Sequence, residues 1–270
     1  MCAYLDTLQK ETFEERTQKD KLFELWEEYG KINYNNWYNL SFFKEIKESM
    51  EGLFVPIQND GSGSVLDAGC GPGTMFRSIL NKIWPRRLVG VDISSTMRAK
   101  AEKEAKKLMS PDFKVFDIQR VDLTEKLPWA DNEFDAVVSN IVIYYLTDPG
   151  WSHAISEFCR IVKPGGYIYI STLLQGHDQT VLIKESKWKI QTLLGSPWGI
   201  FNLAWALWHK KHPVIINECA KEAGVQYPSR EGILSLLKNC GSNDVVTKEI
   251  FWGAGIVLRA KMNKKSSVDD

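Results

Sequence analysis

Three glycines recur at every second position in the stretch SVLDAGCGPGTM, which covers residues 64–75. Gly69, Gly71 and Gly73 follow a run that is typical of a buried strand and that ends near Asp67, and a helical pattern comes directly after them. A glycine has no Cβ, so a ligand can approach the main chain closely at these positions. The stretch therefore predicts a loop that holds a ligand with its backbone.

Two other kinds of glycine loop fit this spacing less well. A phosphate-binding P-loop needs Gly-Lys-Ser or Gly-Lys-Thr, whereas this chain continues as GPGTM, so the P-loop is excluded. A dinucleotide loop has the spacing G-x-G-x-x-G. Here the third glycine comes one residue early, and Pro72 removes an amide that could face phosphates. An NAD-dependent oxidoreductase stays open on the glycines alone.

Acidic side chains fall where the next predicted strands end. Asp92 closes the run LVGVD, and Asp122 with Leu123 follows the next extended segment. Open parallel sheets bind ligands at the carboxyl ends of their strands, so we expect these residues at one edge. Asp92 can accept hydrogen bonds from both hydroxyls of a ribose. Asp122 can accept one from an adenine amino group while the Leu123 amide donates to a ring nitrogen; Asp117 remains the alternative to Asp122.

The fourth predicted strand ends at Ser139 and Asn140, whose carbonyls come at the level where the ammonium of an amino acid would lie. Plainer roles remain for two of the acids. Asp67 can cap the helix that follows it, and Asp92 can form a simple turn at the end of its strand.

The elements that must bring these residues together alternate between strand and helix. After a turn-rich connector at 58–64, short apolar runs alternate with amphipathic helical patterns. This order predicts an α/β fold with a parallel sheet and helices on both faces. Near the C-terminus, NDVVTKEIFW and AGIVLRAKM are separated by Gly253 alone, so they must pair as an antiparallel hairpin.

In these motifs the chain resembles a class I S-adenosylmethionine-dependent methyltransferase, of the broad type 11 group that acts mostly on small molecules. VLDAGCGPG, GVDIS, VDLTEKLPWADNEFDAVVS and EFCRIVKPGGYIYIST match that family's glycine loop, ribose acid, adenine segment and approach to the fifth strand, in order and at the usual spacing. The resemblance spans about Val65 to Thr172 and resumes in the terminal hairpin. It implies a Rossmann-like sheet of seven strands with an antiparallel last strand.

The resemblance also implies a cofactor, S-adenosyl-L-methionine (SAM), and its product S-adenosyl-L-homocysteine. By this analogy the glycine loop surrounds the methionine portion, and Asp67 lies beneath the loop and orients either the loop or the amino group of the ligand. The residues expected to contact the cofactor are Asp67, Gly69, Gly71, Gly73, Asp92, Ile93, Asp122, Leu123 and Asn140, with Tyr34 and Tyr38 from the N-terminal region.

The chain outside the core divides into further segments. We expect an N-terminal helical cap at 1–60, a SAM-binding core at 61–174, a helical Trp-rich lid at 175–232, the completion of the core by the hairpin at 233–262 and a tail at 263–270. In the lid, the aromatic residues Trp198, Phe201, Trp205 and Trp208 fall three or four residues apart and precede HKKH. A stripe of this kind either faces the core, closes over an apolar substrate or lies at a membrane surface.

Methyl transfer depends mainly on alignment, because the sulfonium already makes the methyl group electrophilic; alignment of reactants contributes about 7–11 kcal/mol. If the acceptor must lose a proton, the candidate bases are Tyr144, His177 and Asp178. Tyr144 or Tyr145 can equally be core, and His177 and Asp178 can belong to a solvated loop. We expect a small lipophilic or aromatic acceptor of the quinone, isoprenoid or phenolic type. The alternatives are a SAM-binding partner subunit without chemistry and a protein side-chain methyltransferase.

Composition narrows the partners. Lys and Arg together number 34, as do Asp and Glu, so no overall basic charge points to nucleic acid. The five cysteines are scattered without a CxxC pair, so we expect reduced thiols and no metal site. No run of 18 uncharged apolar residues occurs. We therefore expect a cytoplasmic protein, with peripheral membrane contact through the lid as a further expectation.

Overall fold

Seven strands form one sheet in the order β3-β2-β1-β4-β5-β7-β6 in the computed structural model, which describes residues 18–31, 41–57, 63–109, 115–146, 150–176, 220–222 and 224–263. The strands are β1 (Ser64–Ala68), β2 (Arg87–Val91), β3 (Val115–Gln119), β4 (Phe134–Asn140), β5 (Val162–Leu173), β6 (Asp244–Ile250) and β7 (Gly255–Lys261). β1 to β5 are parallel, and β7 is antiparallel to both of its neighbours. The predicted α/β fold, with its antiparallel C-terminal hairpin, is confirmed.

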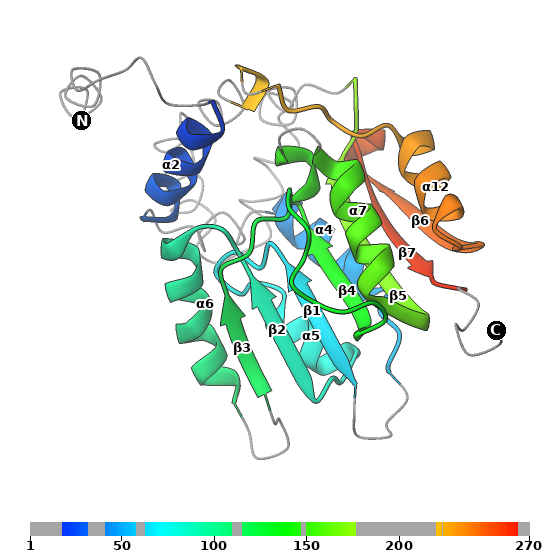
Figure 1. The fold of residues 1–270 in the computed structure, drawn as a ribbon, viewed down its shortest axis with the longest axis horizontal. Coiled ribbons are helices and arrows are strands. Elements are labelled where there is room, and N and C mark those ends of the chain that lie inside the picture. The colour runs from blue at the N-terminus through cyan, green and yellow to red at the C-terminus, as the bar shows by residue number, and fades with distance from the viewer. Residues whose placement is uncertain are drawn as a thin grey trace.

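Helices lie on both faces of this sheet, and α2 lies beyond the ends of the strands, next to α6 (Figure 1). They are α2 (Gln18–Lys31), α4 (Ser41–Glu51), α5 (Phe76–Lys82), α6 (Ser95–Leu108), α7 (Gly150–Ile161) and α12 (Arg230–Asn239), with short 3-10 turns η1 (Ile143–Tyr145) and η2 (Phe251–Gly253). One apolar layer joins the sheet to α7 and α12, and the other joins it to α4, α5 and α6.

Both faces of the central strands are buried, because successive side chains of a strand point to opposite sides. In β1, Leu66 and Ala68 pack in the α7 layer while Val65 packs in the α5 layer. The near-continuous apolar run in the sequence reflects this double coverage. It also leaves Asp67, between Leu66 and Ala68, on the α5 side of the sheet.

β4 ends at Asn140, where the sequence predicts the end of the fourth strand, although the apolar run FDAVVSNIVIYYL continues to Leu146. Ile141 has a φ of 58°, a left-handed conformation that interrupts the strand, and η1 follows it. The residues KPGG, at 163–166, lie within β5, where the β4–β5 register shifts between Phe134 and Ala136.

The regions outside the core are described in part. Of the predicted cap, α2 and α4 are described, and α4 packs Ile46 and Met50 into the α5 layer. Most of the predicted Trp-rich lid, at 177–219, lies outside the described residues, so its boundaries stay a prediction. Within the described ranges, no helix has the length and apolar character to cross a membrane.

Candidate functional site

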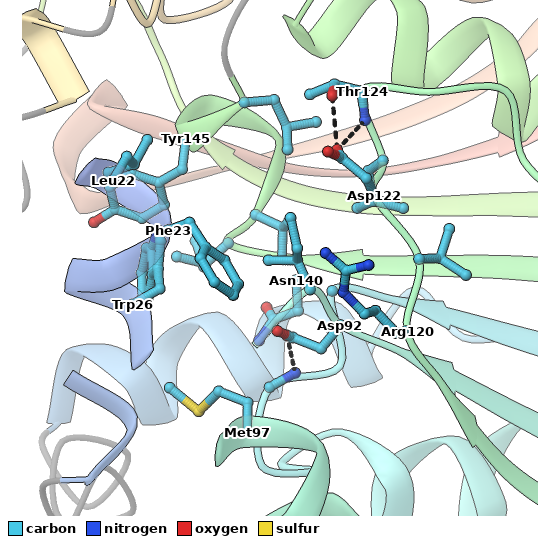
Figure 2. A pocket seen from close by; sticks show the side chains of 18 of the residues that line it. Leu22, Phe23, Trp26, Asp92, Met97, Arg120, Asp122, Thr124, Asn140 and Tyr145 are labelled. Atoms are coloured by element: carbon cyan, nitrogen blue, oxygen red, sulfur yellow. Dashed lines mark hydrogen bonds between the residues drawn. The ribbon is translucent and has the colours of Figure 1, made fainter. Parts of the chain in front are cut away.

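A pocket of about 500 Å³ opens at the carboxyl ends of the parallel strands. Its walls come from the loops that follow β1, β2, β3 and β4, and from one face of α2 (Figure 2). Pockets of this size are typical of sites for small molecules and cofactors. The carboxyl ends of the parallel strands therefore meet at one edge of the sheet, as the positions of the acids in the sequence predicted.

The glycine loop forms the floor of the pocket. Gly69 and Gly71 line it, both with positive φ, and a Cβ on Gly69 would lie 2.5 Å from Val142 Cγ2. A Cβ on Gly71 would meet no atom within 4 Å, so it would project into open space that a ligand can use. Gly73 does not line the pocket; a Cβ there would lie 2.5 Å from the Phe76 ring. Gly73 thus serves the packing of α5, and the first two glycines form the cradle.

Asp92 joins the glycine loop to the start of α6. Its Oδ2 accepts a hydrogen bond from the Gly71 amide at 2.9 Å, and its Oδ1 accepts one from the Ser94 amide at 2.9 Å. Burial raises the pKa of Asp92 to about 6, against the opposing effect of these two donors. Arg98 donates to the carbonyls of Asp92 and Ile93, both of which line the pocket. The loop is therefore held rigidly at the position predicted to bind a ribose.

Asp67 lies in the core below the loop rather than in the pocket wall. Asp67 is 1% exposed as a residue, and its Oδ2 has no hydrogen-bond partner among the described residues. Burial, with a smaller contribution from the charge of Asp92, raises the pKa of Asp67 to about 8. An orphaned acidic oxygen below a bare loop, beside a second acid, suits a ligand that carries positive charge. The residues present therefore fit the predicted cofactor.

The segment after β3 forms the next wall. Asp122, Leu123 and the exposed Arg120 line the pocket. Asp122 Oδ1 accepts from the Thr124 amide at 2.9 Å and the Thr124 hydroxyl at 2.7 Å, so one carboxylate oxygen shapes the turn. The alternative acid, Asp117, does not line the pocket and accepts a hydrogen bond from a neighbouring glutamine on β3. Asp122 therefore lies in the pocket wall and Asp117 does not, while the contact of Asp122 with an adenine stays a prediction.

An ion pair on α7 fastens this segment from behind. Arg160 donates to the carbonyls of Trp129 at 2.8 Å and Leu127 at 3.0 Å, and it pairs with Glu157 at 2.7 Å. Glu157 in turn accepts from the Leu127 amide at 2.8 Å. The hydrogen bond from Arg160 holds the pKa of Glu157 below its usual value. Sequence reasoning used EFCR only as a family signature and missed this positioning role.

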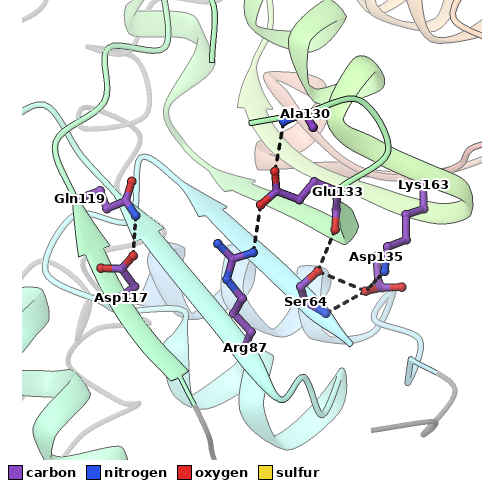
Figure 3. Close-up of polar contacts among 8 residues, drawn as sticks. All are labelled: Ser64, Arg87, Asp117, Gln119, Ala130, Glu133, Asp135 and Lys163. Atoms are coloured by element: carbon purple, nitrogen blue, oxygen red, sulfur yellow. Dashed lines mark hydrogen bonds and ion pairs between the residues drawn. The ribbon is translucent and has the colours of Figure 1, made fainter. Parts of the chain in front are cut away.

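Polar contacts at the opposite edge of the sheet keep the strands in register (Figure 3). Arg87 on β2 pairs with Glu133 at 3.0 Å, and Glu133 also accepts from the Ala130 amide at 3.1 Å. The Ser64 amide at the start of β1 donates to Asp135 on β4 at 2.8 Å. These contacts fix where each strand begins, and so where each one ends at the pocket.

The chain beyond β4 supplies an aromatic side chain. Asn140 lines the pocket, and its Oδ1 accepts a hydrogen bond from the Ser171 hydroxyl at 2.6 Å. Tyr144, the predicted catalytic tyrosine, is 3% exposed, does not line the pocket and stacks on Tyr227 with ring centroids 5.6 Å apart. Tyr145 lines the pocket instead. The turn η1 therefore places Tyr145, rather than Tyr144, in the pocket wall.

Helix α2 brings side chains that the sequence analysis did not assign to the site. Leu22, Phe23 and Trp26 line the pocket, and the Trp26 ring meets the Tyr145 ring edge-on at 4.9 Å between centroids. Figure 2 shows Phe23 and Trp26 on α2 beside Tyr145, across from Asp122. Their spacing on one helical face was the available signal. The other predicted site residues, Tyr34, Tyr38, His177 and Asp178, lie outside the described residues.

Comparison with known proteins supports the same interpretation. Residues 65–166 match the methyltransferase domain family. A malonyl-[acyl-carrier protein] O-methyltransferase of Pseudescherichia vulneris is 30% identical over 135 residues, which cover 48% of this chain and 47% of the relative. The chain thus spans about half the length of the curated relatives that it matches.

Solved structures show the likeness in fold. A SAM-dependent methyltransferase of Thermotoga maritima superposes with a TM-score of 0.56 at 17% identity, covering 90% of this chain and all of the other. A phosphoethanolamine N-methyltransferase of Haemonchus contortus, solved with S-adenosylhomocysteine, gives 0.57 at 14% identity, covering 90% of this chain and 60% of the other. At these identities the likeness concerns the fold alone.

Proposed function

We propose that this chain, which is a class I S-adenosylmethionine-dependent methyltransferase by its matched domain and its fold, transfers the methyl group of SAM to a small apolar or aromatic acceptor. The observation that carries the proposal is the pocket itself. One cavity of about 500 Å³ brings together the glycine loop, the acids Asp92 and Asp122 at the ends of two strands, and an aromatic wall from α2 and η1.

The cofactor is SAM, and the chain offers a separate group for each of its parts. The open space at Gly71 and the buried acid Asp67 suit the charged methionine end. Asp92 suits the ribose, and the turn at Asp122 and Leu123 suits the adenine. When bound, SAM supplies a methyl group that its sulfonium has already activated.

The acceptor side of the pocket is the wall that these cofactor groups leave unused. Leu22, Phe23, Trp26, Tyr145 and Leu146 line it, and all five are apolar or aromatic. Such a wall favours an acceptor of the quinone, isoprenoid or phenolic type, because burial of apolar surface drives its binding.

The protein contributes mainly by alignment and by the exclusion of water, since alignment alone can supply about 7–11 kcal/mol. Tyr145 lines the acceptor side of the pocket, where its ring contacts Trp26. For an acceptor that must lose a proton, His177 and Asp178 remain the proposed bases, because Tyr144 lies behind Tyr145 in the core.

The test uses the purified full chain. SAM binding is measured by calorimetry, and S-adenosylhomocysteine formation is measured across pools of naphthols, catechols, quinols and prenyl alcohols. We expect SAM binding, turnover in at least one pool, and a loss of both in Asp92→Ala but not in Asp244→Ala, which removes an exposed acid on β6. Folded protein that binds no SAM refutes the proposal. SAM binding without turnover in any pool favours a non-catalytic, SAM-binding subunit.

A further inference from the structure

Glu27 on α2 reaches across to the first turn of α6. Its carboxylate accepts hydrogen bonds from the hydroxyls of Ser95 at 3.0 Å and Thr96 at 2.8 Å, and from the backbone amides of both residues. The first amides of a helix have no partner within the helix, and the helix dipole favours an anion there. A side chain from a distant helix thus caps α6.

This contact holds a charged group. Burial acts to raise the pKa of Glu27, but the hydrogen bonds from Thr96 and Ser95 outweigh it and leave the pKa below its ordinary value. Glu27 is therefore ionised at neutral pH, and its hydrogen bonds are of the stronger, charge-assisted kind.

The packing of α2 supports the same contact. Gly30, one turn after Glu27, is buried, and a Cβ on it would lie 3.0 Å from Thr96 Cγ2. The C-terminal half of α2 therefore rests directly on the start of α6. A larger side chain at residue 30 would push the two helices apart.

The same helix carries the aromatic wall of the pocket. Phe23 and Trp26 precede Glu27 by four residues and one residue, and both line the cavity. Trp26 also meets Tyr145 edge-on at 4.9 Å. Because a helix moves as a rigid unit over such short distances, the contact of Glu27 with α6 fixes how far Phe23 and Trp26 extend into the pocket (Figure 2).

The contact between Glu27 and α6 also lies close in sequence to Asp92, the acid predicted to bind the ribose. Ser94, whose amide donates to Asp92 and whose hydroxyl accepts from the Met97 amide at 3.1 Å, immediately precedes the residues that Glu27 holds. One short stretch therefore anchors Asp92 on one side and α2 on the other.

We propose that Glu27 is a positioning residue, which docks α2 on α6 so that Phe23, Trp26 and Tyr145 form a wall for a neutral, planar aromatic acceptor. Aromatic rings that meet edge-on present both faces and edges, which suits stacking with a further ring. The assignment of this wall to the acceptor rests on the proposed function. The docking of α2 through Glu27 does not.

The first experiment measures the docking in ligand-free protein by hydrogen exchange. Glu27→Gln keeps the shape of the side chain but loses the charge and two acceptor positions, so exchange in α2 should be about tenfold faster or more. Glu28→Gln is the matched control, because Glu28 is an exposed neighbour that pairs with Lys31 within the same helix. Gly30→Leu, which pushes α2 away by bulk, should act like Glu27→Gln. Equal exchange in α2 of Glu27→Gln and wild type overturns the proposal.

The second experiment measures the affinity of the protein for 2-naphthol, a planar aromatic probe of the wall, in the presence of bound S-adenosylhomocysteine. We expect Glu27→Gln and Trp26→Ala to bind 2-naphthol about tenfold more weakly or worse, because the apolar wall is displaced or truncated. Glu28→Gln should bind it as wild type does. The affinity for S-adenosylhomocysteine should stay within about threefold in all of these variants, a split that general unfolding would not produce.

The outcomes separate the two proposals. Wild-type protein that fails to bind S-adenosylhomocysteine contradicts the proposed function, while the exchange experiment still tests the docking. Wild-type protein that binds S-adenosylhomocysteine but not 2-naphthol, or Glu27→Gln that binds 2-naphthol normally, overturns the acceptor wall and leaves the proposed function standing.

Discussion

Replacing Asp67 with asparagine is expected to stabilise the ligand-free protein, increasingly so as the pH rises. Burial and the nearby charge of Asp92 raise the pKa of Asp67 from 3.8 to about 8. A group whose pKa is raised by folding stabilises the folded state while it is protonated. That stability is fully present below pH 3.8 and is lost as the pH rises toward 8.

The size of the effect follows from the pKa difference. The pKa of Asp67 differs by about four units between the unfolded and folded states, and each unit corresponds to about 1.4 kcal/mol. The free energy of unfolding therefore falls by roughly 6 kcal/mol between low and high pH, and about 4 kcal/mol of this has been lost by pH 7. An asparagine side chain cannot ionise in either state, so this pH-dependent loss disappears in Asp67→Asn. The new amide group lacks a partner, which costs about 1–3 kcal/mol at every pH. The net gain at pH 7 should be about 1–3 kcal/mol.

The assay is urea unfolding of wild type and Asp67→Asn at pH 5, 7 and 9. The difference between their free energies of unfolding should grow by about 4 kcal/mol from pH 5 to pH 9 in favour of the variant. The raised pKa of Asp92 affects both proteins and largely cancels in this difference. Asp244→Asn, an exposed carboxylate at the start of β6, controls for the loss of one negative charge. A difference that is the same at all three pH values would falsify the reasoning.

Three further predictions concern the pocket and its supports. Because the pKa of Asp92 is about 6, its carboxylate is largely protonated at pH 5, so SAM affinity by calorimetry should fall about tenfold from pH 7 to pH 5, and this drop should shrink in Asp92→Asn. Arg160→Lys cannot reproduce the fork of hydrogen bonds to Glu157 and the segment after β3, so it should lower the free energy of unfolding by about 1–3 kcal/mol and weaken SAM binding; an unchanged melting temperature contradicts this. Gly71→Ala should weaken SAM binding more than Gly73→Ala does, whereas Gly73→Ala should lower the melting temperature more than Gly71→Ala does, since only the Cβ added at residue 73 meets a core ring. Equal changes of the two variants in both assays would count against the assigned roles.

The parts of the site that sequence reasoning located depend on short-range rules. A glycine in a tight loop is recognised from its own conformational freedom, and Gly69 and Gly71 do have positive φ beside the pocket. Asp92 and Asp122 were located because parallel strands place their carboxyl ends at one edge, so the end of each strand in the sequence is also a position in space.

The details that sequence reasoning missed depend on contacts between distant segments. The left-handed Ile141 and the turn η1 decide that Tyr145 lines the pocket and Tyr144 packs in the core. An alternation rule cannot reveal this, because the strand ends before the rule would apply.

The sequence by itself determined the α/β class, the antiparallel hairpin and the order of the ligand-binding loops, since each follows from patterns within about ten residues. Only the tertiary structure decided that α2 closes one side of the pocket. The reason is physical: Glu27 finds its partners at Ser95 and Thr96, almost seventy residues along the chain. A periodic pattern shows that a helix has an apolar face, and only packing shows what that face covers.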